Sequence, residues 1–184
     1  MERLSFSKTN QYDGLEAAIH LARYAFVQRL CVDRTVLDLA CGEGYGSRQL
    51  LAWGAKRVVG VDVSDEAIES AKANFSGSGI EFLASDAQQL RQQFAPQSFD
   101  LIVSLETIEH VPFPGQLLED FKALLAPDGT LVVSCPNDWW YYPSEAERNP
   151  YHLRKYRFDE FKQFAEGILG EAQAWYLGGA QAGF

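Results

Sequence analysis

The stretch VLDLACGEGYG, from Val36 to Gly46, decides the fold of this chain. Its apolar first half, Val36–Ala40, contains a single acid, Asp38, and predicts a buried parallel strand. After the glycines, apolar residues take helical spacing up to Gly54, a suitable helix end. Glycines between a strand and a helix admit unusual backbone angles and let a ligand lie against the backbone, so the stretch predicts a ligand site. The glycines are Gly42, Gly44 and Gly46.

Strand and helix patterns alternate along the rest of the chain, which predicts an α/β fold with an open, doubly wound, mainly parallel sheet. The expected strands are 36–40, 57–63, 80–84, 99–104, 130–134 and a sixth at 172–177. The expected helices cover 15–30, the residues up to Gly54, 64–75, part of 88–97, 117–125 and 158–168. In such sheets, ligands bind beyond the carboxyl ends of the strands.

The N-terminal segment, 1–34, is expected to be mainly helical and to pack through one apolar face of the helix 15–30. That face comprises Leu15, Ala18, Ile19, Ala22, Phe26 and Leu30. Its other residues His20, Arg23 and Tyr24 could reach over the ligand, and Tyr12 before the helix could fold back onto it.

Composition limits the class of protein. The chain has 184 residues, of which 47% are hydrophobic and 22% charged, which suits one domain over 1–184. The net charge of −9 disfavours nucleic acid and anionic membrane surfaces as partners. The three cysteines are far apart and form no CxxC pair, which indicates reduced thiols and a cytoplasmic protein. We expect neither export nor a membrane span, because no signal pattern or long apolar run occurs.

Three acids lie at or near the carboxyl ends of successive expected strands: Asp38, Asp62 and Asp86. Asp62 follows Gly42 by twenty residues, the spacing at which an acid can accept both hydroxyls of a ribose. Any one acid alone is better interpreted as a solvated loop residue or a helix cap. The ordered set, together with the glycine turn, favours a nucleoside ligand with its adenine near Val63, Asp86 and Ala87.

The glycine spacing distinguishes between nucleosides. A dinucleotide fingerprint reads G-x-G-x-x-G, but the third glycine position, counted from Gly42, is Ser47. The stretch also lacks the Lys-Ser/Thr ending of a phosphate-binding loop. A nicotinamide-dependent oxidoreductase is therefore the weaker alternative, and the chain also lacks a second nucleotide-binding half.

Five stretches of the chain carry a resemblance to a known family: VLDLACGEGYG at 36–46, VVGVDVS at 58–64, ASDAQQL at 84–90, FDLIVSLETIEHV at 99–111 and LLAPDGTLVVSCPN at 124–137. In this order they resemble the class I S-adenosylmethionine-dependent methyltransferases. They are most similar to the small-molecule type that includes the ubiquinone-biosynthesis O-methyltransferases. A weaker similarity continues from Asn149 to Phe161. The resemblance implies a Rossmann-like fold and S-adenosylmethionine as cofactor.

The resemblance also implies roles for single residues. Gly42, Glu43 and Gly44 would lie against the methionine part of the cofactor, and Asp62 would hold the ribose. Val63 would pack on the adenine, whose edge Asp86 and Ala87 would read. Leu105 and Glu106 would lie near the sulfonium. The cofactor-binding residues expected are Asp38, Ala40, Gly42, Glu43, Gly44, Asp62, Val63, Asp86, Ala87 and Leu105.

Methyl transfer by in-line displacement to a small-molecule or glycan-type acceptor is the expected reaction. A base helps if the acceptor is a hydroxyl or amine, and His110 is the first candidate, followed by Glu106 and then Glu109 and His152. An equally weighted alternative makes His110 a structural histidine that closes the loop. Glu106 and His110 have metal-ligand spacing, but no third ligand is evident, so we predict no metal site. A non-catalytic domain that only binds the cofactor is a further alternative.

The segment 135–158 reads as an irregular, aromatic, lid-like insertion. Trp139 to Tyr142 either cover the acceptor or pack the segment, and the sequence weighs these equally. Nearby basic residues either meet an anionic acceptor or, more commonly for such runs, form a solvated face. They are Arg148, His152, Arg154, Lys155 and Arg157.

The family has seven strands, so we expect the C-terminal edge of this sheet to be incomplete and the native chain to continue beyond Phe184. A bare edge beside the apolar stretch 175–184 would favour self-association or pairing with further chain.

Overall fold

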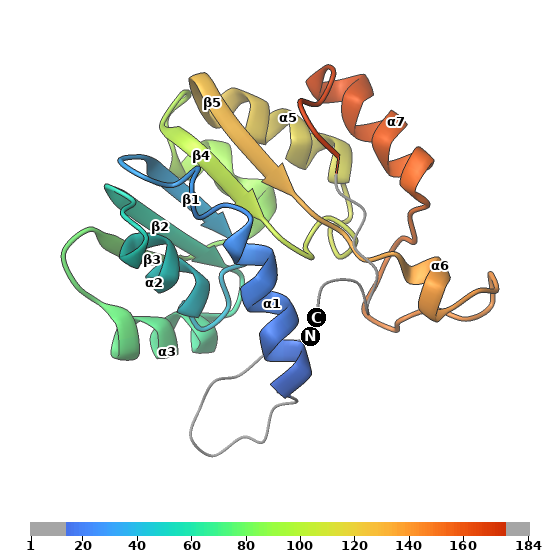
Figure 1. The fold of residues 1–184 in the computed structure, drawn as a ribbon, viewed down its shortest axis with the longest axis horizontal. Coiled ribbons are helices and arrows are strands. Elements are labelled where there is room, and N and C mark those ends of the chain that lie inside the picture. The colour runs from blue at the N-terminus through green and yellow to red at the C-terminus, as the bar shows by residue number, and fades with distance from the viewer. Residues whose placement is uncertain (1–13, 176–184) are drawn as a thin grey trace.

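A computed structural model describes residues 14–175 of the chain. Five parallel strands form one sheet in the order β3-β2-β1-β4-β5, with helices on both faces (Figure 1). The strands are β1 Thr35–Leu39, β2 Arg57–Asp62, β3 Ile80–Ala84, β4 Phe99–Ser104 and β5 Leu125–Val133. The strand order reverses between β1 and β4, so the ligand site predicted at the carboxyl ends belongs beside these two strands.

The helices connect and cover the strands. They are α1 Gly14–Ala25, α2 Tyr45–Ala52, α3 Asp65–Phe75, α4 Leu90–Gln93, α5 Pro114–Leu124, α6 Asp138–Tyr141 and α7 Phe158–Leu169. A 3-10 turn, η1 Ala87–Gln89, precedes α4. Ser64 caps α3, because its hydroxyl accepts from the amide of Ala67 in the first turn of the helix.

Alternating side chains of the strands build a core on each face of the sheet. On one face, Leu37 and Val59 pack with α5 and α7. On the other face, Val36 and Val58 pack with Leu50 of α2. Strands buried on both faces explain why the sequence shows continuous apolar runs here rather than alternation.

The predicted helix 15–30 is wrong in its end and in its buried face. α1 ends at Ala25, and the chain continues in turns in which Val27 bonds back to Tyr24 and Leu30 back to Val27. The tighter turns break the helical spacing, so Phe26 is 64% exposed and Leu30 41% exposed. The residues that enter the core instead are Tyr24, Val27 and Cys31.

Two predicted boundaries near the C-terminal half also differ. Leu125 belongs to β5 rather than to the preceding helix, because α5 ends at Leu124. Pairing of β5 with β4 jumps from Phe99–Leu125 to Leu101–Thr130, so residues 126–129 lie inside β5 as an irregularity, and β5 begins five residues before the predicted strand 130–134. Residues 172–175, the described part of the predicted sixth strand, are not in a strand.

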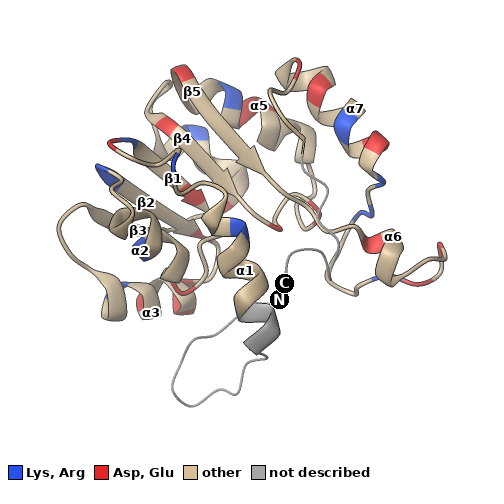
Figure 2. Ribbon diagram, viewed as in Figure 1, with Lys and Arg blue, Asp and Glu red and all other residues tan. Residues whose placement is uncertain are grey.

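Tyr12 and residues 176–184 lie outside the described part. The cysteines Cys31 and Cys41 are buried, Cys135 is half-buried, and all three are free thiols, as predicted. In Figure 2, basic residues are scattered among acidic ones. No helix between residues 14 and 175 has the length and apolar character needed to cross a bilayer.

Candidate functional site

The loop after β1 carries three residues with left-handed backbone angles: Ala40, Gly42 and Gly44, with φ of 59°, 55° and 82°. The two glycines serve different purposes. A Cβ on Gly44 would lie 2.7 Å from the ring of Phe82, so packing alone requires glycine there. A Cβ on Gly42 would meet no atom of the described residues within 4 Å. The loop backbone is therefore open at Gly42, where a ligand can approach it.

Asp62 connects this loop to the end of β2. Its carboxylate accepts one hydrogen bond from the amide of Gly42 and another from the amide of Ser64, both at 2.9 Å. The side chain is 8% exposed. The predicted partners Gly42 and Asp62 thus lie together, and the acid fixes the position of the open backbone.

Asp38 lies beneath the loop rather than beside the open space. It is 1% exposed, and its carboxylate accepts from the hydroxyls of Tyr24 at 2.9 Å and Ser47 at 2.6 Å. Burial raises the pKa of Asp38 to about 7. These bonds join α1 and α2 to β1, so Asp38 holds the elements of the site in place. Its burial does not favour the direct contact with a cofactor that the sequence predicts. Ser47 occupies the third glycine position of a dinucleotide fingerprint, and its hydroxyl makes the buried hydrogen bond to Asp38.

The residues predicted around an adenine lie on the neighbouring loops after β2 and β3. Val63 is 53% exposed, Ala87 is half-buried and Asp86 is exposed. The Asp86 carboxylate accepts from the amide of Gln88 at 2.9 Å and so caps η1. The interpretation of Asp86 as a helix cap is thus confirmed, while its contact with a ligand stays a prediction.

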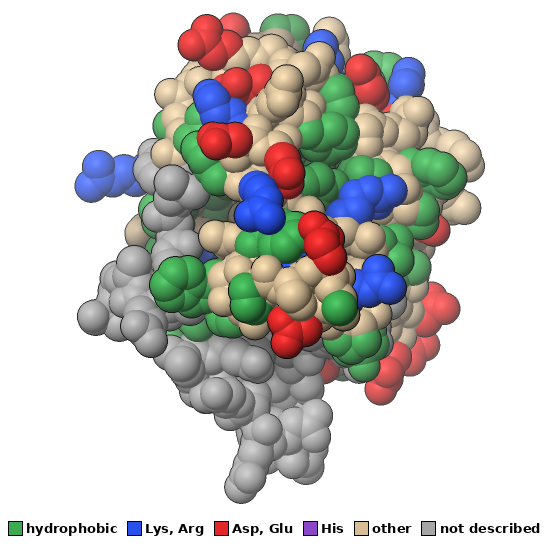
Figure 3. All heavy atoms as spheres, turned by 90° about the vertical axis from the view of Figure 1, so that its right-hand side faces the viewer, with side chains coloured by type: hydrophobic (Ala, Val, Ile, Leu, Met, Phe, Trp, Pro, Cys, Tyr) green, Lys and Arg blue, Asp and Glu red, His purple; other side chains and the backbone are tan. Residues whose placement is uncertain are grey.

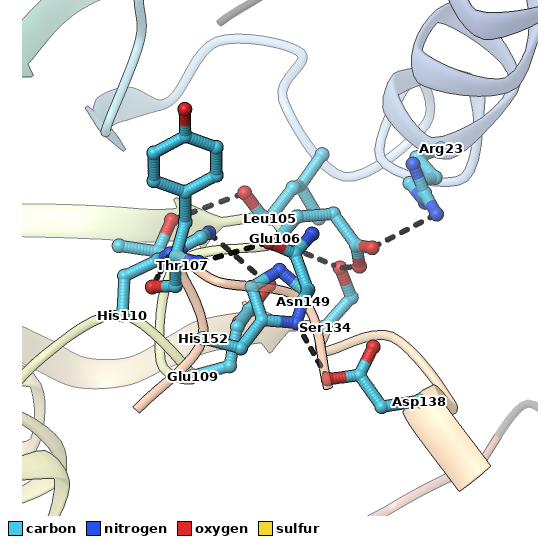
Figure 4. A network of polar contacts seen from close by, with 11 residues as sticks. Arg23, Leu105, Glu106, Thr107, Glu109, His110, Ser134, Asp138, Asn149 and His152 are labelled. Atoms are coloured by element: carbon cyan, nitrogen blue, oxygen red, sulfur yellow. Dashed lines mark hydrogen bonds and ion pairs between the residues drawn. The ribbon is translucent and has the colours of Figure 1, made fainter. Parts of the chain in front are cut away.

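Glu106, in the loop after β4, is held from two sides (Figure 4). Its carboxylate lies 2.9 Å from the guanidinium of Arg23 and accepts from the Ser134 hydroxyl at 2.6 Å. Its φ of 51° is unusual for a residue with a side chain, and the amide of Glu106 bonds back to Ser134. Glu106 and its neighbour Leu105 therefore lie where α1, β4 and β5 meet, at the switch point of the sheet.

Four residues of this loop and of the segment after β5 form a second polar group, which we term the Glu–His cluster: Glu109, His110, Asp138 and His152 (Figure 4). The His110 Nδ1–H donates to the Tyr151 carbonyl at 3.0 Å. The His152 Nδ1–H donates to Asp138 at 2.5 Å. Burial, together with the charge of Glu106, raises the pKa of Glu109 to about 9.

Sequence reasoning missed the role of Asp138 and the meeting of these side chains. Glu109 and His110 are adjacent, but His152 comes 42 residues after His110 and reaches it only through the fold. Glu106, the ligand suggested by spacing, is not in the Glu–His cluster, because Arg23 and Ser134 hold its carboxylate.

The basic residues of the segment 135–158 bind mainly to the segment itself. The Lys155 ammonium donates to the carbonyls of Tyr142, Ser144 and Glu147, and the Arg154 guanidinium to those of Val111 and Pro112. Lys155 and Arg157 also lie over the ring of Trp139, at 3.8 and 3.9 Å from its centroid. Arg154 and Lys155 are half-buried and donate to backbone carbonyls, so neither predicted role, a contact with an anionic acceptor or a solvated face, is favoured for these two side chains.

The same segment forms shallow hollows on the face that carries α6 and α7, where apolar and charged side chains alternate (Figure 3). One hollow of 230 Å³ is lined by Asn137, Trp139, Trp140, Arg157 and Phe158. Trp140 is 74% exposed beside it. An aromatic surface close to the Glu–His cluster is thus available to an acceptor.

Comparison with known proteins gives a consistent result. Residues 32–172 match the sequence profile of a family described as "Methyltransferase domain". The chain is 29% identical over 148 residues to a "Probable S-adenosylmethionine-dependent methyltransferase" of Mycolicibacterium smegmatis, covering 80% of this chain and 56% of that protein. It is 35% identical over 109 residues to a "Ubiquinone biosynthesis O-methyltransferase" of Haemophilus ducreyi, covering 56% and 46%.

A solved structure agrees with these relatives. The N-methyltransferase NodS of Bradyrhizobium japonicum, in complex with S-adenosylhomocysteine, superposes with a TM-score of 0.57 at 25% identity, covering 66% of this chain and 62% of that one. The chain spans about half the length of the mycobacterial relatives that it matches.

Proposed function

The chain belongs to the class I S-adenosylmethionine-dependent methyltransferases, and we propose that it transfers the methyl group of this cofactor to a small-molecule or glycan-type acceptor. One observation carries the proposal: the loop backbone is open at Gly42, is held by Asp62, and lies at the switch point of a parallel sheet. This is where sheets of this kind bind nucleosides.

The residues around the loop fit the charge and shape of the cofactor. S-adenosylmethionine supplies a methyl group on a cationic sulfonium, together with an ammonium group. The half-buried Glu43 and the carboxylates of Asp62 and Glu106 surround the loop with negative charge, which lowers the electrostatic energy of a bound cation. The open backbone at Gly42 admits the methionine part, and the exposed face of Val63 takes the adenine.

The protein contributes mainly alignment to such a displacement. Holding both reactants in line is worth up to ~7–11 kcal/mol of the barrier. A base can add ~10²–10⁴-fold if the acceptor must lose a proton. We keep His110 as the first candidate and Glu106 as the second. The bond from His110 Nδ1 to the Tyr151 carbonyl leaves Nε2 as the nitrogen able to accept that proton.

The role of Asp62 provides the test. We predict that Asp62→Asn weakens the binding of S-adenosylhomocysteine by at least about tenfold, a loss of ~1.4 kcal/mol, measured by titration calorimetry. The matched control is Asp65→Asn, which removes an exposed carboxylate three residues away and should bind as the unchanged chain does. Equal affinity of both variants would contradict the assignment of Asp62 to the ribose.

Catalysis is tested separately from binding. Radiolabelled S-adenosylmethionine is incubated with panels of hydroxylated and amine-bearing small molecules and of glycans, and methyl transfer to product is counted. Transfer to any member supports the proposal. Tight cofactor binding without transfer to either panel would instead favour the non-catalytic alternative.

A further inference from the structure

The segment 135–158 contributes to two hollows that lie next to each other. One is the aromatic hollow of 230 Å³ described above, and the other has a volume of 190 Å³ and a mainly polar lining. Trp139 lines both, so we term the two hollows together the Trp139 surface. Its lining includes Asn137, Trp139, Trp140, Glu145, Arg148 and His152.

The size of the hollows favours a ligand longer than a single ring. Pockets that enclose a small molecule have volumes of roughly 300–1,000 Å³ and a mainly apolar lining. Each hollow here is smaller, and the second is lined mostly by charged and polar side chains. Two small hollows side by side fit consecutive units of an extended ligand, each of which stays partly open to water.

The lining combines flat apolar rings with side chains of both hydrogen-bonding kinds. Trp140 presents an indole that is 74% exposed, beside the amide of Asn137. An amide donates and accepts, the Glu145 carboxylate accepts and the Arg148 guanidinium donates. A sugar ring matches this pattern, because its C–H face packs on an aromatic ring while the hydroxyls at its edge donate and accept.

The cationic side chains of the surface have partners within the protein, which disfavours an anionic ligand. Arg154 and Lys155 donate to backbone carbonyls. The Arg157 guanidinium lies over the ring of Trp139, and its Nε is 3.9 Å from the Glu160 carboxylate. An uncharged, hydroxyl-rich ligand therefore fits better than a phosphorylated or carboxylated one.

The second hollow reaches the loop after β4. His152 lines this hollow, and its ring meets that of His110 edge to face, with centroids 4.7 Å apart at 81° (Figure 4). A hydroxyl of a unit bound there thus lies on the side of the molecule that carries His110, the first candidate base.

We propose that the Trp139 surface binds an uncharged saccharide of two or more units, and that a hydroxyl of this saccharide accepts the methyl group. This inference rests on the proposed methyl transfer and names its acceptor class. The hydroxyl oxygen forms the new bond to the methyl carbon, and the carbon–sulfur bond breaks with its electron pair left on sulfur. The hydroxyl proton passes to His110 Nε2.

Binding is measured by titration calorimetry in the presence of S-adenosylhomocysteine, with neutral malto-, cello- and chito-oligosaccharides of increasing length. We expect at least one series to bind, with affinity rising at least about tenfold from the monosaccharide to the trisaccharide as the second hollow is filled. Oligogalacturonates, which carry carboxylates, should bind no more tightly. Absence of binding in every series, or tighter binding of the carboxylated series, would overturn the proposal.

Variants locate the saccharide. Trp140→Ala and Asn137→Ala should each weaken its binding at least about tenfold, a loss of ~1.4 kcal/mol. The matched control is Tyr141→Ala, which removes a neighbouring ring that is 55% exposed and is not in the lining of either hollow. Circular dichroism and S-adenosylhomocysteine affinity should be unchanged in all three variants. Unchanged saccharide affinity in Trp140→Ala, or an equal loss in Tyr141→Ala, would refute the surface.

Methyl transfer separates this inference from the proposed function. Transfer to a bound oligosaccharide, with a raised KM in Trp140→Ala, would support both. Transfer to phenols or amines only would overturn the saccharide acceptor and leave the proposed function in place. Saccharide binding without transfer to any acceptor would retain the binding surface and contradict the proposed methyl transfer.

Discussion

Asp38 is the residue whose burial has the clearest thermodynamic consequence. Its pKa is raised to about 7 by burial, against an ordinary value of 3.8. Between these pH values the folded chain keeps a proton that the unfolded chain releases. The stability contribution is therefore fully present below pH 3.8, falls as pH rises toward 7, and is constant above it, with a slope of at most about 1.4 kcal/mol per pH unit.

We predict that Asp38→Asn removes this slope. The free energy of unfolding is measured by urea denaturation from pH 4 to 8 for the unchanged chain, for Asp38→Asn and for the exposed control Asp65→Asn. The difference between the unchanged chain and Asp38→Asn should vary with pH below about 7 only. A difference that is constant with pH would show that Asp38 titrates normally.

Gly44 is required for packing, whereas Gly42 leaves space for a ligand, so substitutions at these two positions should have different costs. Gly44→Ala should cost about 2–4 kcal/mol of stability, from its left-handed backbone and the clash with Phe82. Gly42→Ala should cost only about 1–2 kcal/mol, because its Cβ enters open space. Chemical denaturation measures both, and the reverse order of the two losses would contradict this division of roles.

Local spacing predicted the residues of the glycine loop because each is fixed by its neighbours in the chain. The positions of Gly42 and Asp62 in the site could be predicted because Gly42 lies in the turn after the first strand and Asp62 at the end of the next strand. The meeting of the Glu–His cluster follows from no local pattern: His152 and its partner Asp138 come from an irregular segment, whose path depends on tertiary packing. That segment also bonds to the loop after β4, because the amide of Leu153 donates to the carbonyl of Glu109.

At the scale of elements, the cap of α3 permits a direct test. Ser64→Ala should destabilise the chain by about 1 kcal/mol, because the amide of Ala67 loses its acceptor. Ser64→Asp is the matched control and should keep most of the stability, since aspartate caps helices equally well. Thermal unfolding compares them, and equal losses would show that the hydroxyl contributes nothing as a cap.

The five strands of the sheet were predicted to within one or two residues, apart from the start of β5, since continuous apolar runs between turn residues admit few alternatives. The sixth strand expected at 172–177 is not formed in its described residues, 172–175. The end of α1 was predicted wrongly. Helical spacing of apolar residues continues in the sequence through Phe26 and Leu30, but the backbone tightens into turns after Ala25. Side chains of the turns then enter the core at Val27 and Cys31. Packing against α2 and β1 therefore determines where α1 ends, and the spacing of apolar residues in the sequence gives no sign of it.

At the scale of the molecule, the alternation of strands and helices predicted the parallel, doubly wound sheet, and the order β3-β2-β1-β4-β5 places the glycine loop at its switch point. The family resemblance predicted the cofactor, which the comparisons support. The acceptor could not be predicted, because its binding depends on surfaces such as the hollow beside Trp139, which no motif encodes.

The most direct test of the central claim is thermal unfolding of the chain with S-adenosylmethionine, S-adenosylhomocysteine or NAD added separately. A ligand at a hundred times its dissociation constant stabilises the folded state by ~2.7 kcal/mol, which raises the midpoint measurably. We predict a rise with both sulfur nucleosides and none with NAD. A rise with NAD alone, or with none of the three, would contradict the assignment of the glycine loop as an S-adenosylmethionine site.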